Sequence, residues 1–243
     1  MASGKLRSMT PPERPKTADH IHALPEARSD LLRQIKQRGP LHASELAALL
    51  HITREAVRQQ LKLLEQGGWI VRVTERSPHQ AGRPPLRYML TPAGDHLFPK
   101  RYDELSLTLV DTIAEQLGPE ALTTLLTALT DQQVHQWEPK LAGKPLIERI
   151  RALKGIYFEG DPHISVERDR RGYLLVEHNC PYLNLAMQRP RLCSVTVSTL
   201  TRLLGVRVVR ERRFQDGDQR CAFRVLADER VDTEHFRFAF EAA

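Results

Sequence analysis

The hydrophobic positions of the first hundred residues follow the period of helices and then that of strands. Apolar residues at helical spacing predict helices over 29–38, 43–50 and 54–66, with a tight connection between the second and the third. Thr53 stands directly before the third helix and is its predicted N-cap. Two short helices joined this closely are typical of a helix-turn-helix.

Two strand-like segments follow the third helix. Gly67-Gly68 ends the helix, and residues 69–73 and 86–90 have the composition of strands. Between them lies a polar, turn-rich stretch with basic residues. The order of three helices, a strand, a basic loop and a strand predicts a winged helix-turn-helix domain over residues 25–98.

The third helix has one apolar and one polar face. Val57, Leu61 and Leu64 share the apolar face. Side chains that bond base edges and phosphates lie on the polar face and on the wing. The predicted DNA contacts are Thr53, Arg54, Arg58, Gln59 and Lys62 on the helix, and Arg76, Arg83 and Arg87 on the wing. An ordinary solvated helix has a similar polar face, so this face alone does not distinguish DNA binding from simple exposure. The wing predicted after the helix favours DNA binding.

A helical stretch over residues 99–142 follows the predicted winged helix. Its hydrophobic residues keep a four-residue period at Leu105, Leu109, Ile113 and Leu117. Such a stripe is either core within one domain or the seam of a dimer. Because DNA operators are commonly palindromic, we expect a helical linker that joins two copies of the chain as a homodimer.

Residues 143–243 mix both kinds of pattern. A helix after Pro145, a hairpin that turns at 169–172, helical runs over 182–188 and 190–204, and strands over 207–213 and 220–226 predict an α+β domain. The expected fold class of the whole chain is α+β: an N-terminal winged helix-turn-helix, a helical dimerisation linker and a C-terminal α+β metal-sensor domain.

Composition narrows the function. The chain has 243 residues, of which 41% are hydrophobic and 27% charged, and its net charge of +6 favours a polyanionic partner such as double-stranded DNA. Residues 1–24 have no apolar segment of a signal peptide and predict a disordered basic arm.

No apolar run is long enough to span a membrane, so we expect a cytoplasmic protein. No P-loop, dinucleotide-binding glycine motif, zinc-protease helix or nucleophile elbow occurs, which argues against an enzyme.

The only three cysteines, Cys180, Cys193 and Cys221, lie in the C-terminal third at the ends of predicted elements. Three thiolates from three elements suit an iron–sulfur cluster, although free cysteines also pack as small hydrophobic residues. Zinc sites usually use close Cys-x-x-Cys pairs, which this chain lacks. A 4Fe–4S cluster is favoured and 2Fe–2S is possible. The fourth ligand stays open among Glu177, His178, Asn179, Asp218, His235 and an external thiol.

Over residues 27–226 the chain resembles the SufR family, bacterial winged-helix repressors of iron–sulfur cluster assembly genes. The likeness rests on the helix-turn-helix at 52–61, Gly82-Arg83-Pro84 of the wing, the segment 97–102 and the sequences around the first and third cysteines, His178-Asn179-Cys180-Pro181 and Gly217-Asp218-Gln219-Arg220-Cys221. The resemblance implies that the cysteines hold an oxygen-sensitive cluster whose occupancy sets operator affinity. The alternative is a winged-helix regulator that senses zinc or redox state through its thiols without a cluster.

Overall fold

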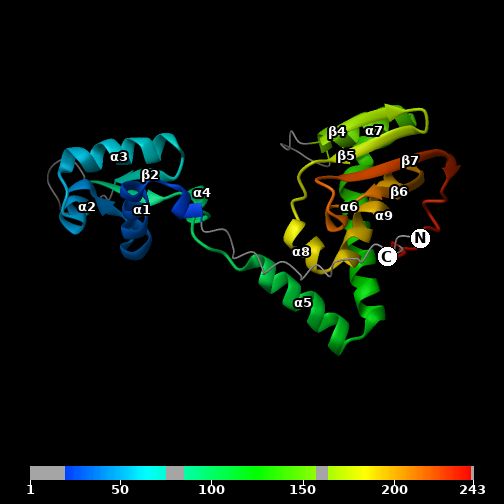
Figure 1. Cartoon of the computed structure of the whole chain (residues 1–243), viewed down its shortest axis with the longest axis horizontal. Helices are drawn as coiled ribbons and strands as arrows, with labels where there is room; N and C mark the ends of the chain where they lie inside the picture. The colour runs from blue at the N-terminus through cyan, green and yellow to red at the C-terminus, as the bar shows by residue number, and fades with distance from the viewer. Residues whose placement is uncertain (1–19, 75–84, 157–163, 242–243) are drawn as a thin grey trace, which may run out of the picture. The chain divides into compact units, whose positions relative to one another are not determined.

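The computed structural model describes residues 20–74, 85–156 and 164–241 and combines helices with two antiparallel sheets (Figure 1). The chain divides into two compact units, Met1–Arg101 and Tyr102–Ala243. This confirms the predicted mixed fold class with an N-terminal winged helix. Most of the predicted basic arm and most of the wing loop lie outside the described residues.

The N-terminal unit packs its three longer helices with a small sheet. Its elements are η1 (His20–Ala23), α1 (Glu26–Arg38), β1 (Leu41–His42), α2 (Ala43–Leu50), α3 (Arg54–Gln66), β2 (Ile70–Thr74), β3 (Leu86–Leu90) and α4 (Pro92–Asp95). The strand order is β1-β3-β2, with β2 and β3 as the two strands of the wing.

The core of this unit buries the apolar face of α3. Val57, Leu61 and Leu64 are buried together with leucines of α1 and α2, as their helical spacing predicts. Thr53 caps α3, because its Oγ1 accepts a hydrogen bond from the backbone N–H of Ala56 at 3.2 Å. The opposite face of α3 is thereby directed away from the core.

The start of α4 packs tightly on the chain between α3 and β2. Thr91 Oγ1 donates to the Gly68 carbonyl at 2.6 Å and accepts from the Gly94 N–H at 3.0 Å. A Cβ atom on Gly94 would lie 1.9 Å from the carbonyl oxygen of Trp69. Because a backbone atom cannot rotate out of the way as a side chain does, only glycine fits at this position.

The C-terminal unit contains a four-stranded sheet and most of the helices. Its elements are α5 (Tyr102–Gln116), α6 (Pro119–Leu141), α7 (Leu146–Ile156), β4 (Ile164–Asp169), β5 (Gly172–Glu177), α8 (Leu183–Gln188), η2 (Pro190–Cys193), α9 (Ser194–Leu204), β6 (Val206–Arg212), η3 (Phe214–Asp216) and β7 (Cys221–Arg230). The strand order is β4-β5-β7-β6, and all pairs are antiparallel. In the described part of the chain, no helix combines the length and apolarity of a membrane span.

Helix α6 belongs to the core of the C-terminal unit. Val134 and Leu141 of α6 are buried with residues of α7, α9 and the sheet. The Thr199 hydroxyl of α9 donates to the Gln133 side chain of α6 at 2.9 Å. The sequence predicts a linker over 99–142 that is separate from the C-terminal domain, whereas the structure places α5 and α6 in the same unit as the sheet. The apolar period identifies a buried face but not the element that covers it.

We predict that Gly94→Ala destabilises the N-terminal unit by about 1–3 kcal/mol, because the added methyl group overlaps the Trp69 carbonyl. Urea unfolding followed by fluorescence in a Trp137→Phe background measures this, since Trp69 is then the sole tryptophan. Gly155→Ala is the control, because no atom lies within 4 Å of its added Cβ. Equal urea midpoints for Gly94→Ala and its parent would contradict the packing described above.

Candidate functional site

The face of α3 opposite the core presents basic and amide side chains to solvent. Arg54, Arg58, Gln59 and Lys62 are all exposed. Arg58 Nη1 lies 3.8 Å from a carboxylate oxygen of Glu55, a loose surface pair that another anion can replace. A recognition helix has the same division into a packed face and a polar face, and its polar face reads the major groove.

The remaining predicted DNA contacts behave differently. The Thr53 hydroxyl caps α3. Arg87 Nη1 donates to the Pro40 carbonyl at 2.9 Å and lies 3.5 Å from Glu45 Oε2. The side chain of Arg87 therefore joins β3 to the start of α2. Arg76 and Arg83 lie outside the described residues.

The three cysteines come together at one end of the C-terminal sheet. Cys221 begins β7 and pairs in register with Glu177, the last residue of β5, and Cys180 follows three residues later. Cys193 ends η2 directly before α9. All three are free; negative charge on Cys193 and Cys221 raises the pKa of Cys180, and negative charge on Cys221 raises that of Cys193. The sheet register and the start of α9 thus gather the three residues that the sequence predicts as ligands.

The thiols are protonated at neutral pH. Burial, and next the charge of Glu177, raise the pKa of Cys180 to about 12. Burial is also the main cause of the raised pKa of Cys193 and of Cys221. Binding of a metal or cluster to these sulfurs must therefore displace protons.

Hydrogen-bond donors surround the same sulfurs. Gln215 Nε2 donates to Cys193 Sγ at 3.2 Å. The Arg210 guanidinium donates to the Cys193 carbonyl at 2.9 Å, and its charge and hydrogen bond oppose the rise in the pKa of Cys221. N–H donors and positive charge stabilise thiolates and the sulfur atoms of clusters. The donor chemistry of the site therefore fits an iron–sulfur cluster.

The residues considered for a fourth ligand are not equivalent. The Asp218 carboxylate accepts from the Arg213 backbone N–H, and the side chain of His235 is 82% exposed and bonded to Asp232. Glu177, by contrast, is 7% exposed, and its charge acts on Cys180 and Cys221. Glu177 is thus the carboxylate that lies with the cysteines.

Within residues 20–74, 85–156 and 164–241, no group of three or more His, Cys, Asp or Glu side chains is arranged to hold a single metal ion. A cluster differs from a single ion because its cysteines bind different iron atoms. Cluster binding is therefore predicted from the kinds of donor groups at the site and not from their arrangement around one metal ion.

Arg210 and Gln215 are absent from the residues predicted from the sequence. Arg210 occupies an inward position of β6, since Val206 and Val208 of the same strand are buried in the core. A charged residue in phase with buried valines is the signal that identifies it. Gln215 lies in η3 and carries no comparable signal.

Comparison with known proteins bears on part of the N-terminal unit. Residues 24–81 match the model of the MarR family. This segment is therefore similar to the winged-helix domain of that family. Proteins of the MarR family are transcription regulators that bind DNA, not enzymes.

The matched segment covers the three helices and the first strand of the wing. A crystal structure of a MarR family transcription regulator is 21% identical, covers 52% of this chain and 80% of that chain, and superimposes with a TM-score of 0.29. A likeness of that extent supports no statement about ligand or assembly. No curated protein matches the chain.

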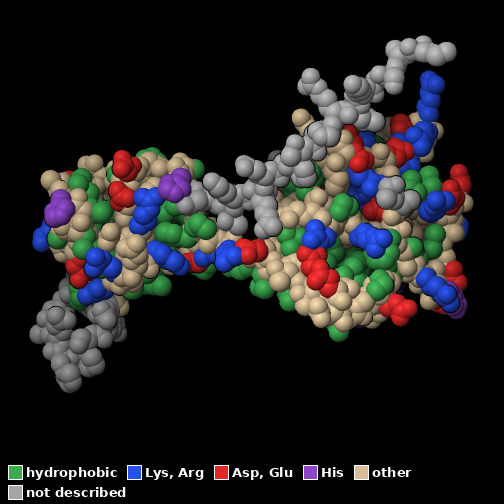
Figure 2. Space-filling view, turned by 60° about the horizontal axis from the view of Figure 1, so that its bottom comes forward, with side chains coloured by type: hydrophobic (Ala, Val, Ile, Leu, Met, Phe, Trp, Pro, Cys, Tyr) green, Lys and Arg blue, Asp and Glu red, His purple; other side chains and the backbone are tan. Residues whose placement is uncertain are grey.

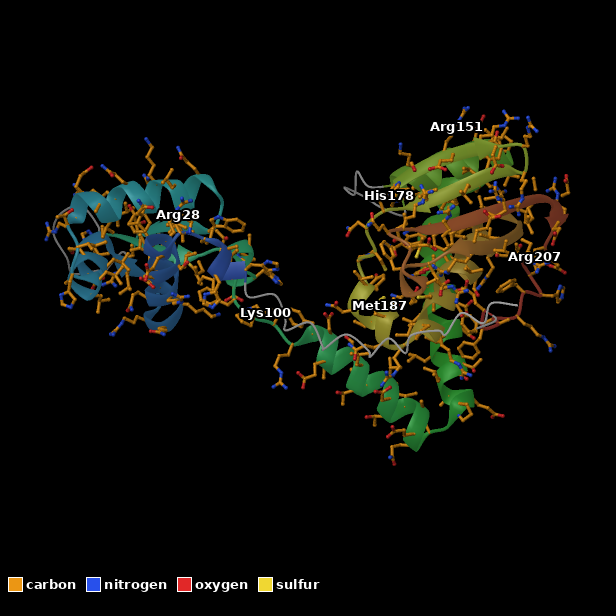
Figure 3. The ribbon with its side chains drawn as sticks, in the orientation of Figure 1. Arg28, Lys100, Arg151, His178, Met187 and Arg207 are labelled. Carbon is orange, nitrogen blue, oxygen red and sulfur yellow. The ribbon has the colours of Figure 1, made fainter. Side chains whose placement is uncertain are left out.

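We predict that Arg58→Ala and Gln59→Ala each weaken binding to a DNA site selected from a random library by about 1–3 kcal/mol, roughly tenfold or more, because each removes an exposed side chain of α3 that we expect to contact a base. Fluorescence anisotropy at fixed salt measures the loss. Arg151→Ala is the charge-matched control, an exposed arginine of α7 in the C-terminal unit (Figure 3). If both α3 variants bind like the control, α3 does not read the DNA.

Proposed function

We propose that this chain is a homodimeric, cytoplasmic transcription repressor whose operator affinity is set by an iron–sulfur cluster on Cys180, Cys193 and Cys221, and that it regulates iron–sulfur cluster assembly genes. The observation that carries the proposal is the meeting of three thiols beside a buried guanidinium, in a chain that also contains a segment similar to the MarR-family winged-helix domain. The regulated genes are inferred from the resemblance to the SufR family.

The state of the thiols favours a metal-bound site over a thiol switch. A cysteine that reacts with oxidants needs a lowered pKa, because the thiolate is the reactive form. Here burial raises the pKa of all three cysteines. Metal ligation deprotonates such thiols despite burial, because the positive ion replaces the proton.

A bound cluster supplies an oxygen-sensitive group at the end of the sheet. Helix α8 lies in the sequence between two of the proposed ligands, Cys180 and Cys193. Ligation would therefore restrain both ends of the segment that contains α8. Helix α8 is joined to α5 by two polar bridges. Asn184 Nδ2 donates to Asp103 at 2.6 Å, and Arg189 Nε donates to Asp111 at 2.6 Å.

Helix α5 is the element through which the site affects DNA binding in this proposal. It begins at Tyr102, directly after the N-terminal unit, and has no buried residue of its own. Its position therefore depends on the bridges to α8 and on contacts with α6 rather than on a core. Binding or loss of the cluster changes α8, and α8 carries that change to the helix that follows the winged-helix unit.

Helix α5 also supplies the proposed dimer surface. Leu105, Leu109 and Leu117 of the four-residue stripe are exposed, Leu117 to 70%. Figure 2 brings this side of the C-terminal unit forward and shows hydrophobic side chains among the polar ones. Exposed leucines at helical spacing favour a second helix as their partner. A homodimer would place two recognition helices on the two halves of a palindromic operator.

We predict that protein purified without oxygen contains iron and acid-labile sulfide in equal amounts and absorbs broadly in the visible range, and that Cys193→Ser loses both, because one of three protein thiolates is removed. Thr196→Ala, one turn along α9, is the matched control and keeps the cluster. Trp137 fluorescence verifies that each variant folds. A colourless wild-type protein that holds only zinc, or no metal after anaerobic reconstitution, would contradict the cluster.

A further inference from the structure

Arg210 is a buried cation at the edge of the thiol site. It lies on β6 in phase with the buried Val206 and Val208, and its side chain is only 4% exposed. Its guanidinium carbon lies 4.6 Å from the centre of the Phe223 ring of the adjacent strand. A guanidinium at such a position is stabilised only if hydrogen bonds and an opposite charge replace its water.

The partners of Arg210 connect two parts of the chain. Arg210 Nε lies 3.0 and 3.2 Å from the two carboxylate oxygens of Glu241, and Nη2 lies 3.1 Å from one of them. The same Nη2 donates to the Cys193 carbonyl at 2.9 Å. Its charge also acts on Cys193 and Cys221. One guanidinium therefore holds both the C-terminal segment and the main chain of a proposed ligand.

Residues 236–241, which we name the C-terminal strap, lie along the segment that carries Cys193. The backbone N–H of Glu241 donates to Ser194 Oγ at 2.9 Å, and Ser194 is 1% exposed. The Phe240 ring centre lies 5.2 Å from the guanidinium carbon of Arg191. The strap is thus fastened on both sides of Cys193, to Arg191 in η2 and to Ser194 at the start of α9.

Negative charge gathers at this end of the sheet when thiolates form. Glu177 is buried beside Cys180 and Cys221, and three thiolate ligands add further negative charge when a cluster binds. The positive charge of Arg210 favours the thiolate forms of Cys193 and Cys221. It therefore offsets part of the negative charge that the ligands carry.

We propose that Arg210, held in place by Glu241 of the C-terminal strap, is a positioning residue of the cluster site. It fixes the main chain at Cys193 and places a positive charge against the sulfur ligands. The assignment rests on the proposed function for the identity of the bound group. It makes the C-terminal strap part of the sensor, so that a change in a residue outside the sheet alters how firmly the cluster is held.

The test compares Arg210→Met and Glu241→Gln with an exposed ion pair between β6 and β7. Arg207 Nη1 lies 2.9 Å from Glu229 Oε2, and both side chains are solvent-accessible, so Arg207→Met and Glu229→Gln are matched controls. Glu241→Gln leaves the sheet untouched and keeps the test valid if Arg210→Met does not fold.

Two measurements on cluster-loaded protein separate positioning from simple stability. We expect the rate of cluster loss in air to rise about tenfold or more in both test variants and to stay within about twofold of wild type in the controls. We also expect a lower midpoint potential in Arg210→Met, because a nearby positive charge favours the reduced, more negative cluster. A variant that is merely less stable does not change the potential.

A third measurement needs no cluster. In metal-free protein, mass spectrometry of backbone hydrogen exchange over residues 191–194 should show faster exchange in Arg210→Met and Glu241→Gln than in the controls, because the strap and the main chain at Cys193 are released. If the wild-type protein binds no cluster, the proposed function fails, while this readout still decides whether Arg210 and the strap hold Cys193. Equal cluster loss, potential and hydrogen exchange in test and control variants would overturn the inference.

Discussion

The burial of ionisable groups at one end of the C-terminal sheet is the constraint on which this molecule depends. The Glu177 carboxylate, the Arg210 guanidinium and the Cys221 thiol are buried there, and the partly buried Cys180 and Cys193 lie in the same region. Such groups cost free energy unless charge and hydrogen bonds are balanced among them. Without a ligand the balance is met by keeping the thiols protonated and by pairing Arg210 with Glu241. A bound cluster would replace three protons by iron and would leave Arg210 as a neighbouring positive charge.

The same region is connected to the remainder of the unit by polar contacts on two sides. Helix α9 begins after Cys193 and contacts α6 through Thr199 and Gln133, within a shared core. Helix α8 lies between Cys180 and Cys193 in sequence and holds α5 through Asn184 and Arg189. The first connection adjoins the buried core. The second is exposed and polar, and it is the one through which the proposed coupling passes from α8 to α5.

The winged helix was largely predictable because its signals are local. The spacing of Val57, Leu61 and Leu64, the cap at Thr53 and the glycine pair at the end of α3 define three helices and the first wing strand without knowledge of tertiary contacts. The side-chain role of Arg87 was not predictable in this way. Its partners, Pro40 and Glu45, lie more than forty residues earlier in the chain, and only the pairing of β1 with β3 brings them together.

The candidate site was predictable in part, because local signals mark the ends of the elements that carry the cysteines. The ends of strands and helices marked the three cysteines as residues that can meet, and the register of β5 with β7 brings Glu177 opposite Cys221. Arg210 and the C-terminal strap were not found. The phase of Arg210 with Val206 and Val208 marks it as an inward-facing residue, but its partners in η2 and near the C-terminus follow only from the tertiary contacts. The placement of α6 in the C-terminal core was missed for a related reason, since a helical period indicates a buried face and not its partner.

The most direct test of the account is the affinity of one selected DNA site for the same protein preparation before and after its cluster is removed with a chelator under anaerobic conditions. The account predicts that the cluster-loaded form binds at least about tenfold more tightly, a coupling free energy of about 1.4 kcal/mol, and that the difference disappears in Cys193→Ser. Equal affinities for the loaded and metal-free forms would contradict the claim that the thiol site controls the winged helix.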